Sequence, residues 1–315
     1  MKKLILGLAA ALTALAASGP AYAGGPLMLI GATEDAVRQP TLAGAKGQMD
    51  LLTLAGFNAV RVTQEWAPGQ TAVSESDLNI LRNVVQAARL DGVTVILGVT
   101  NHGSRTTPLT DDDRAQFASY AASIAQALPS IRSFVIGNEP NINGYWLPQF
   151  NPDGSDAAAP AYEALLAETY DALKAVSPKI QVLGGALSPH GSDDPSLSRP
   201  THSPTGFIQD MGAAYRASGR TTPIMDGLAF HPYEDNSSIA PDRTHPNSTT
   251  IALADYDKLV ALLGNAFDGT AQLGSTLPIY DDEFGVEAQI PADKATEYTG
   301  TEPSTVKPVS EAVPD

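Results

Sequence analysis

The sequence predicts an α/β protein of the (β/α)8 TIM-barrel type, and three observations favour this fold. Short β-branched or apolar runs alternate with longer helical patterns between residues 24 and 283. Strands joined through helices must be parallel, because each crossover returns the chain to the same end of the sheet. The first strand is followed by Gly31-Ala32-Thr33-Glu34-Asp35, which lacks the glycine-rich and P-loop patterns of an open nucleotide-binding sheet. A ring of strands with helices outside it is therefore expected.

Seven segments have the length and apolar content of buried strands. We expect strands at Leu27–Gly31, Ala59–Thr63, Thr94–Val99, Phe134–Gly137, Ile180–Gly184, Gly227–His231 and Pro278–Asp281. Six segments between them have helical spacing, near Leu42–Leu54, Asp77–Leu90, Asp112–Leu128, Ala157–Val176, Thr205–Ser218 and Ile251–Leu263. Ser74 and Asp111 stand where helix N-caps belong.

The first 23 residues have the composition of a signal peptide. Lys2 and Lys3 precede an apolar run, Leu4–Ala17, and the small residues Ala21 and Ala23 precede the expected cleavage site. We therefore expect a secreted protein, extracellular or periplasmic. No later segment reaches about 18 consecutive apolar residues, so we expect no membrane anchor.

Residues 24–290 are expected to form one barrel domain, because no repeat or low-complexity linker divides them. Residues 291–315 are rich in Pro, Thr, Ala and Glu and are expected to be an irregular tail. No eighth strand can be found after Phe284, so we expect the eighth strand and the last helix of the barrel to be missing from this chain.

The composition excludes several classes of function. Asp and Glu number 35 against 19 Lys and Arg, a formal net charge of −16, so nucleic acid is not an expected partner. The absence of cysteine excludes disulfides, thiolate catalysis and iron–sulfur clusters. The polar loop residues His190, Asp193, Asp194, His202 and Asp235 match no metal-binding motif, so neither a metal nor a cofactor is expected. We expect a monomer.

Two glutamates stand directly after predicted strands. Glu139 ends the apolar segment Ser133-Phe134-Val135-Ile136-Gly137-Asn138, and Glu283 follows Pro278-Ile279-Tyr280-Asp281-Asp282. Because active groups of TIM barrels gather at the carboxyl ends of the strands, both are expected to face the same mouth. Two carboxyl groups about 5–5.5 Å apart are what a retaining glycosidase uses as nucleophile and as acid/base.

These residues resemble glycoside hydrolase clan A, and the likeness is greatest to families 39 and 5. In that clan an Asn-Glu pair ends the fourth strand and a second Glu ends the seventh, as Asn138-Glu139 and Glu283 do here. The resemblance implies that Glu139 is the acid/base, that Glu283 is the nucleophile and that Asn138 binds the 2-hydroxyl of the sugar. Where the clan often has Thr or Ser before the nucleophile, this chain has Asp282.

The resemblance also implies substrate-binding roles for Arg61, which would orient Glu283, and for His102, His231 and Tyr233. Strand alternation turns Arg61 away from Val60 and Val62, so it needs a carboxylate partner inside the barrel, for which Glu283 is the candidate.

The two tryptophans, Trp66 and Trp146, are candidate stacking platforms for sugar rings. Burial under a loop is an equal alternative for either one, and Tyr145 could take the same role.

The sequence thus predicts a secreted retaining glycoside hydrolase that acts on an oligosaccharide or polysaccharide. A secreted carbohydrate-binding barrel without turnover, or an inactive fragment of such an enzyme, is the alternative. The glycan and its linkage stay open.

Overall fold

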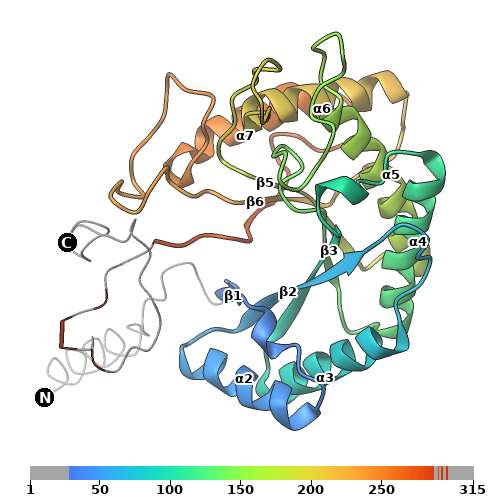
Figure 1. Ribbon diagram of the computed structural model, residues 1–315, viewed down its shortest axis with the longest axis vertical. Coiled ribbons are helices and arrows are strands. Elements are labelled where there is room, and N and C mark those ends of the chain that lie inside the picture. Colours follow the sequence, from blue (N-terminus) through green and yellow to red (C-terminus); the bar gives the residue numbers. More distant parts are fainter. Residues whose placement is uncertain (1–27, 287–289, 291, 294–295, 297–315) are drawn as a thin grey trace, which may run out of the picture.

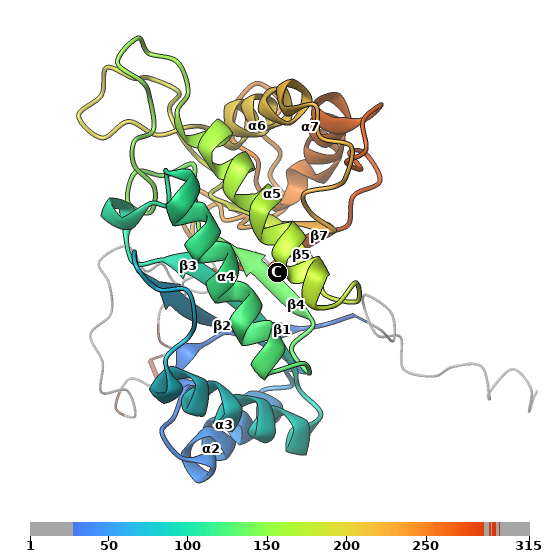
Figure 2. The same ribbon diagram turned by 90° about the vertical axis from the view of Figure 1, so that its right-hand side faces the viewer.

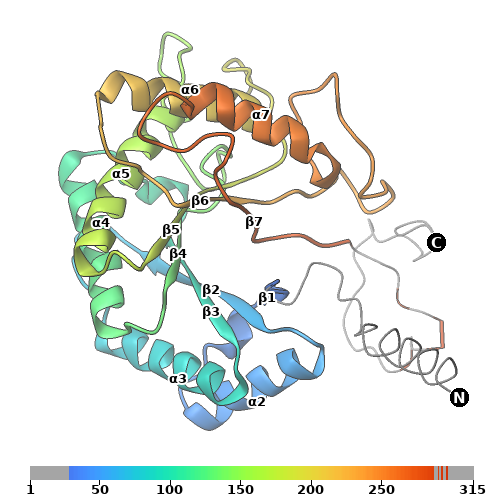
Figure 3. The same cartoon turned by 180° about the vertical axis from the view of Figure 1, so that it is seen from behind.

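The computed structural model describes residues 28–286, 290, 292–293 and 296. Seven parallel strands pair in chain order in one sheet: β1 (Gly31–Thr33), β2 (Ala59–Trp66), β3 (Thr94–Asn101), β4 (Ser133–Ile136), β5 (Gln181–Leu187), β6 (Gly227–Phe230) and β7 (Ile279–Asp281). The sheet curls, so that β1 and β7 lie at the two margins of an incomplete barrel (Figures 1 and 3). The predicted TIM-barrel type is confirmed, with an open side between these two strands.

In the described part of the chain, six α-helices follow the strands. They form an arc around the outer face of the sheet (Figure 1). They are α2 (Leu42–Leu54), α3 (Glu75–Asp91), α4 (Asp111–Ala127), α5 (Ala158–Val176), α6 (Pro204–Ser218) and α7 (Tyr256–Phe267). Short 3₁₀ turns lie at η1 (Asp35–Val37), η2 (Ser104–Thr106) and η3 (Leu253–Asp255). Figure 2 shows α4 and α5 crossing the outer face of the central strands. None of the helices in the described part of the chain has the length and hydropathy needed to span a bilayer.

Two helix N-caps follow from local hydrogen bonding. Ser74 caps α3 as expected, since its hydroxyl accepts from the Asp77 N–H at 3.1 Å. The cap of α4 is Thr110 and not Asp111: its hydroxyl accepts from the Asp113 N–H at 3.1 Å, and the Asp113 carboxylate accepts in return. Asp111 is instead the first residue of the helix, where its charge suits the positive end of the helix dipole.

The first strand lies further along the chain than expected. Gly31 pairs with Ala59, which places β1 at Gly31–Thr33 and not at Leu27–Gly31. Asn58 explains the shift, because its backbone N–H and side-chain oxygen bind the carbonyl and N–H of Ile30, both at 2.8 Å, just before the strand. The predicted signal peptide and most of the predicted tail lie outside the described residues.

The curled sheet separates two apolar regions. The larger fills the space between the outer face of the strands and the helices, with aromatic members such as Phe117, Tyr162 and Phe207. The smaller lies inside the barrel and consists of Val135, Leu183, Ala186 and Ala229, with Ile96 and Tyr280 against them. Because both faces of the sheet are buried, the carboxyl ends of the strands are the place where polar side chains can gather.

Candidate active site

Glu139 stands in a sharp turn after β4. Its φ is +40°, a left-handed conformation that residues other than glycine seldom adopt, and Gly137 before it has φ +82°. The N–H of Glu139 donates to the carbonyl of Ala186 in β5 at 2.8 Å, which holds the turn against the neighbouring strand. The strand end therefore turns the Glu139 carboxyl group to the mouth of the barrel, and a strained conformation of this kind is characteristic of functional sites.

Glu283 follows β7 and is fixed by the residue before it. The N–H of Asp282 donates to the carbonyl of Phe230 at 3.2 Å, which continues the pairing of β7 with β6. The carbonyl of Asp282 accepts from the Thr33 hydroxyl at 2.8 Å, a contact that reaches across the open side of the barrel to β1. Glu283 is thus placed between the two margins of the sheet.

His231, directly after β6, brings the two glutamates together. Its Nδ1 lies 3.1 Å from Glu139 Oε1 and 3.6 Å from Glu283 Oε2. These two oxygens are therefore at most about 7 Å apart, below most of the range of about 6.5–9.5 Å that inverting glycosidases need. We call Glu139 and Glu283 the glutamate pair; their side chains are 18% and 23% exposed, whereas His231 is fully buried.

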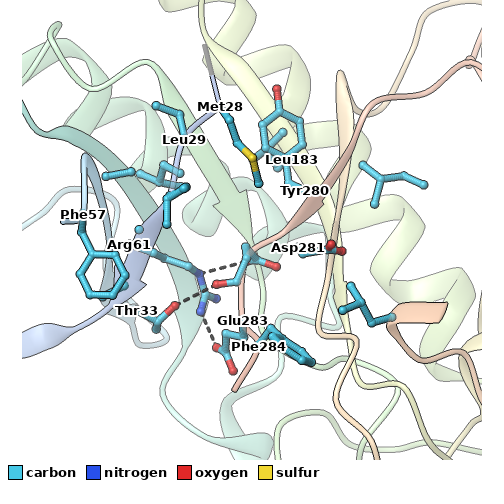
Figure 4. A pocket seen from close by; sticks show the side chains of 18 of the residues that line it. Met28, Leu29, Thr33, Phe57, Arg61, Leu183, Tyr280, Asp281, Glu283 and Phe284 are labelled. Carbon is cyan, nitrogen blue, oxygen red and sulfur yellow. Dashed lines mark hydrogen bonds and ion pairs between the residues drawn. The ribbon is translucent and has the colours of Figure 1, made fainter. Parts of the chain in front are cut away.

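Arg61, on β2, lies beneath the pair with only 5% of its side chain exposed. Its Nη1 forms an ion pair with Glu283, and its Nη2 donates to Asn138 Oδ1 at 3.3 Å. Its Nε lies 3.0 Å from Asp282 Oδ2. Figure 4 shows the ion pair between Arg61 and Glu283. The structure thus places the arginine against the carboxylate proposed for it from the sequence, and against a second one.

A cavity of about 920 Å³ runs along the inner face of the sheet between β1 and β7. Figure 4 shows side chains that line it. It is lined by apolar residues such as Met28, Ile96 and Leu183, and it reaches Arg61 and Glu283. Most of the lining is the apolar interior of the barrel, and the charged residues Arg61, Asp282 and Glu283 lie at one end.

The charges at the site determine the protonation of His231. Burial alone would lower its pKa, but the carboxylates of Asp282 and Glu139, with Glu283 nearby, outweigh this effect and raise the pKa to about 9. His231 is therefore a cation at neutral pH and neutralises part of the negative charge around it.

Tyr233 and Phe284 lie beside the glutamate pair. Their rings stack at 6.2 Å with an interplanar angle of 28°. Burial, together with the negative charges of Glu283 and Glu139, raises the pKa of the Tyr233 phenol. Tyr145 lies on the same mouth: it is 43% exposed, and burial together with the same two carboxylates raises its pKa.

His102 lies further out, after β3. Its side chain is 69% exposed and its Nδ1 contacts the carboxylate of Glu65 at the end of β2. The ring is on the same rim as the glutamate pair, but it makes no contact with either glutamate among the described residues.

The two tryptophans are not stacking platforms. Trp66 is fully buried and packs edge-to-face on Phe117 of α4, with its indole N–H donating to the Gln70 carbonyl at 2.8 Å. Trp146 is 1% exposed and packs edge-to-face on Tyr162 of α5. Neither indole can meet a sugar in this structure, and Tyr145 is the exposed aromatic ring in their place.

The alternation of side chains along β2 explains why Trp66 is buried. Side chains alternate between the two faces of a strand, so Trp66 points to the same face as Val60 and Val62, toward the helices. Arg61 and Glu65 point to the opposite face, inside the barrel. This signal was present in the sequence and also indicates Glu65, which sequence reasoning missed. It missed Phe284 as well, which stands next to Glu283, and noted Asp282 only as a departure from the clan.

His202 is a loop residue as expected, but it is buried. It is 2% exposed, its Nε2 donates to the Gln149 carbonyl at 2.8 Å, and it lies 3.2 Å from Asp156 and 3.7 Å from Asp193. These contacts tie together the loops after β4 and β5.

Comparison with known proteins agrees with this fold. The family model described as cellulase (glycosyl hydrolase family 5) matches residues 32–210. A family 39 glycoside hydrolase from the gut symbiont Bacteroides cellulosilyticus WH2 has a similar fold, with a TM-score of 0.55 and 17% identity over 84% of this chain. A monomeric β-xylosidase from Caulobacter crescentus CB15 has a TM-score of 0.50 and 17% identity over 82% of this chain.

The chain spans 50% of the Bacteroides structure and 52% of the Caulobacter structure. None of the curated proteins compared with it matches. The match to the family model covers more than half of the sequence, and the order of strands and the fold agree with it. The chain therefore belongs to glycosyl hydrolase family 5, within the clan A glycoside hydrolases that its residues resemble.

Proposed function

We propose that this protein is an exported retaining glycoside hydrolase that cleaves a β-linked glycan or glycoside by double displacement. The single observation that carries the proposal is the shared contact of Glu139 and Glu283 with His231 Nδ1. This contact brings two carboxyl groups, far apart in the sequence, to within reach of one glycosidic bond. Export rests on the signal-peptide pattern of residues 1–23.

In the first step, ionised Glu283 attacks the anomeric carbon and forms a glycosyl ester, while protonated Glu139 gives its proton to the leaving oxygen. In the second step, Glu139 removes a proton from water, and the hydroxide so formed attacks the anomeric carbon and releases Glu283. The ion pair with Arg61 supports this assignment, because it holds Oε1 of Glu283 in place, while Oε2 lies on the side of His231, 3.6 Å from its Nδ1.

Asn138 is proposed to hold the sugar 2-hydroxyl. Its Oδ1 accepts from Arg61 Nη2, which fixes the amide so that its NH2 group is free to donate to the substrate. The exposed rings of Tyr145 and Phe284, with the half-buried Tyr233 stacked on Phe284, supply the aromatic surface on which sugar rings pack. The carboxylates of the mouth disfavour anionic sugars, so a neutral glycan is expected.

The proposal is tested by release of reducing ends from a panel of soluble glycans, with cellulose-type glucan first because the matching family model is described as cellulase. Mannan and xylan complete the panel. Wild-type protein should release reducing ends from at least one of them, and Glu283→Ala should abolish the release. Binding of a glycan without release would instead support the carbohydrate-binding alternative, and full activity of Glu283→Ala would refute the assignment.

A further inference from the structure

Asp282, immediately before Glu283, is a buried carboxylate that the proposed reaction does not use. Its side chain is 3% exposed. Its Oδ2 lies 3.0 Å from Arg61 Nε and its Oδ1 lies 3.4 Å from His231 Nε2, and neither oxygen makes a well-aligned hydrogen bond to the described residues. A buried charge of this kind is costly unless cations compensate it, so these two ion pairs are the reason that Asp282 can be accommodated.

The two cations use different nitrogens for Asp282 and for the glutamate pair. Arg61 faces Asp282 with Nε and Glu283 with Nη1. His231 faces Asp282 with Nε2, and it faces Glu139 and Glu283 with Nδ1. Asp282 therefore stands behind both cations, on the side away from the glutamate pair.

Nε2 of His231 faces the Asp282 carboxylate, and Nδ1 faces Glu283, which is ionised in the proposed reaction, so each ring nitrogen needs a proton. A neutral imidazole carries only one, and the ring is fully buried, so water cannot supply the second contact. We propose that Asp282 is a positioning residue that keeps the His231 ring cationic, with its Nδ1–H directed at Glu139 and Glu283. The expected effect on turnover rests on the proposed function, whereas the protonation of His231 can be tested without it.

The charged and titratable groups around His231 come from several elements. Facing the ring are Asp282 and Glu283 after β7 and Glu139 after β4. Arg61 on β2 is ion-paired with Asp282 and Glu283, and the Tyr233 backbone N–H donates to the His231 carbonyl at 2.9 Å. The carboxylates favour the cation, whereas Arg61 opposes it. The direction of the His231 pKa agrees with the geometry, since among the carboxylates around the ring Asp282 does most to raise it.

The consequence for the reaction is electrostatic. A cation at His231 stabilises Glu283 while it waits to attack, and it donates to Glu139 when that group becomes a base. Without Asp282 the ring loses one proton near neutral pH, and we expect kcat to fall about tenfold or more with little change in KM.

The test is ¹⁵N NMR of the histidine rings as a function of pH, with His231 assigned by comparison with His231→Asn. Wild-type protein, Asp282→Asn and Asp281→Asn are titrated. Asp281 is the matched control, because it has the same charge one residue earlier, is exposed and is turned away from Arg61 (Figure 4). We expect His231 to stay cationic above pH 8 in wild type and in Asp281→Asn, and its midpoint to fall by about 1 pH unit or more in Asp282→Asn.

An unchanged midpoint in Asp282→Asn, or a wild-type midpoint near the ordinary value of about 6.5, would overturn the inference. If Asp282→Asn does not fold, Asp282→Ser is titrated instead. If neither variant folds, a wild-type midpoint above pH 8 supports the inference and one near 6.5 overturns it. The NMR titration needs no substrate. If the protein hydrolyses no glycan, the proposed function is refuted, but the titration still tests the role of Asp282. With an active protein, the alkaline limb of kcat/KM should move to lower pH in Asp282→Asn and not in Asp281→Asn.

Discussion

Two buried histidines in this protein have similar surroundings, but we assign them different roles: His202 stabilises loops, and His231 belongs to the candidate active site. His202 and His231 are both almost inaccessible, and each lies between carboxylates. Burial would lower the pKa of both rings, but Asp156 and Asp193 raise the pKa of His202 to about 10, as Asp282 and Glu139 raise that of His231 to about 9. Judged by charge alone, either could be a functional centre.

The difference lies in what else their carboxylates do. Around His202, Asp156 accepts from the Ala159 N–H at 2.9 Å and Asp193 accepts from the Ser203 N–H at 2.7 Å, so both serve the starts of α5 and α6. The His202 ring is also covered by Phe150, with ring centroids 4.1 Å apart. Around His231, the glutamate pair is held by the cation and stays partly exposed. Of these two histidines, only His231 contacts acids that can also reach a ligand, as the proposed reaction requires.

Exchange of each histidine for asparagine should separate the two roles most strongly. His202→Asn leaves two carboxylates without their cation and should cost about 3–5 kcal/mol of unfolding free energy, with kcat of the folded protein little changed. His231→Asn removes a charged donor from the glutamate pair and should lower kcat by about 10²–10³-fold. Denaturant unfolding and initial rates on the same samples give both quantities. Equal losses of kcat in the two variants would break the comparison.

The stability of the protein should also depend on pH through His202. Its pKa is raised in the folded state, so its stabilising effect is complete below the unfolded value of 6.5 and is lost as the pH rises through about 10. Between pH 7 and 10, the melting temperature of wild type should fall more than that of His202→Asn, by about 5–10 °C. Parallel curves for the two proteins would show that His202 is not held as a cation.

The aromatic residues extend the same contrast to binding. Tyr145→Ala removes an exposed ring near the glutamate pair and should raise KM about tenfold, with the melting temperature nearly unchanged. Trp146→Phe alters a buried ring against Tyr162, so it should lower the melting temperature and leave KM unchanged. A rise of KM in Trp146→Phe alone would reverse this part of the account.

The smallest effect is expected for a residue whose hydrogen bonds are all within the first turn of α4. Thr110→Ala removes the cap of α4 and should cost about 1 kcal/mol, or about 2–4 °C in melting temperature. Its kcat should equal that of wild type, which calibrates how far a purely structural loss affects activity. Asp111→Asn should have a smaller effect than Thr110→Ala; the opposite order would favour Asp111 as the cap.

The sequence predicts those features that depend on local pattern. Alternation of strand and helix determines the parallel order of the sheet, and parallel strands carry Glu139 and Glu283 to one mouth without any knowledge of the loops. The register of β1 is less predictable, because it depends on hydrogen bonds from Asn58 and not on the apolar run before it.

The burial of loop residues could not be predicted from the sequence pattern. Trp146 and His202 lie in long connections, and their exposure depends on Tyr162 and Phe150, which come from other parts of the chain. The role of Asp282 has the same origin, since its partners Arg61 and His231 come from β2 and from the end of β6. Trp66 is the exception, because the parity of β2 already indicated its burial.

The most direct test of the central claim is mass spectrometry of Glu139→Ala incubated with aryl β-glycosides of glucose, mannose and xylose. A good leaving group needs no acid, so the first step proceeds, whereas the loss of the base slows the second. We predict that the protein gains the mass of one glycosyl group and that the modified peptide contains Glu283. A glycosyl ester on another residue, or fast release of product with inverted anomeric configuration, would contradict the assignment of the glutamate pair.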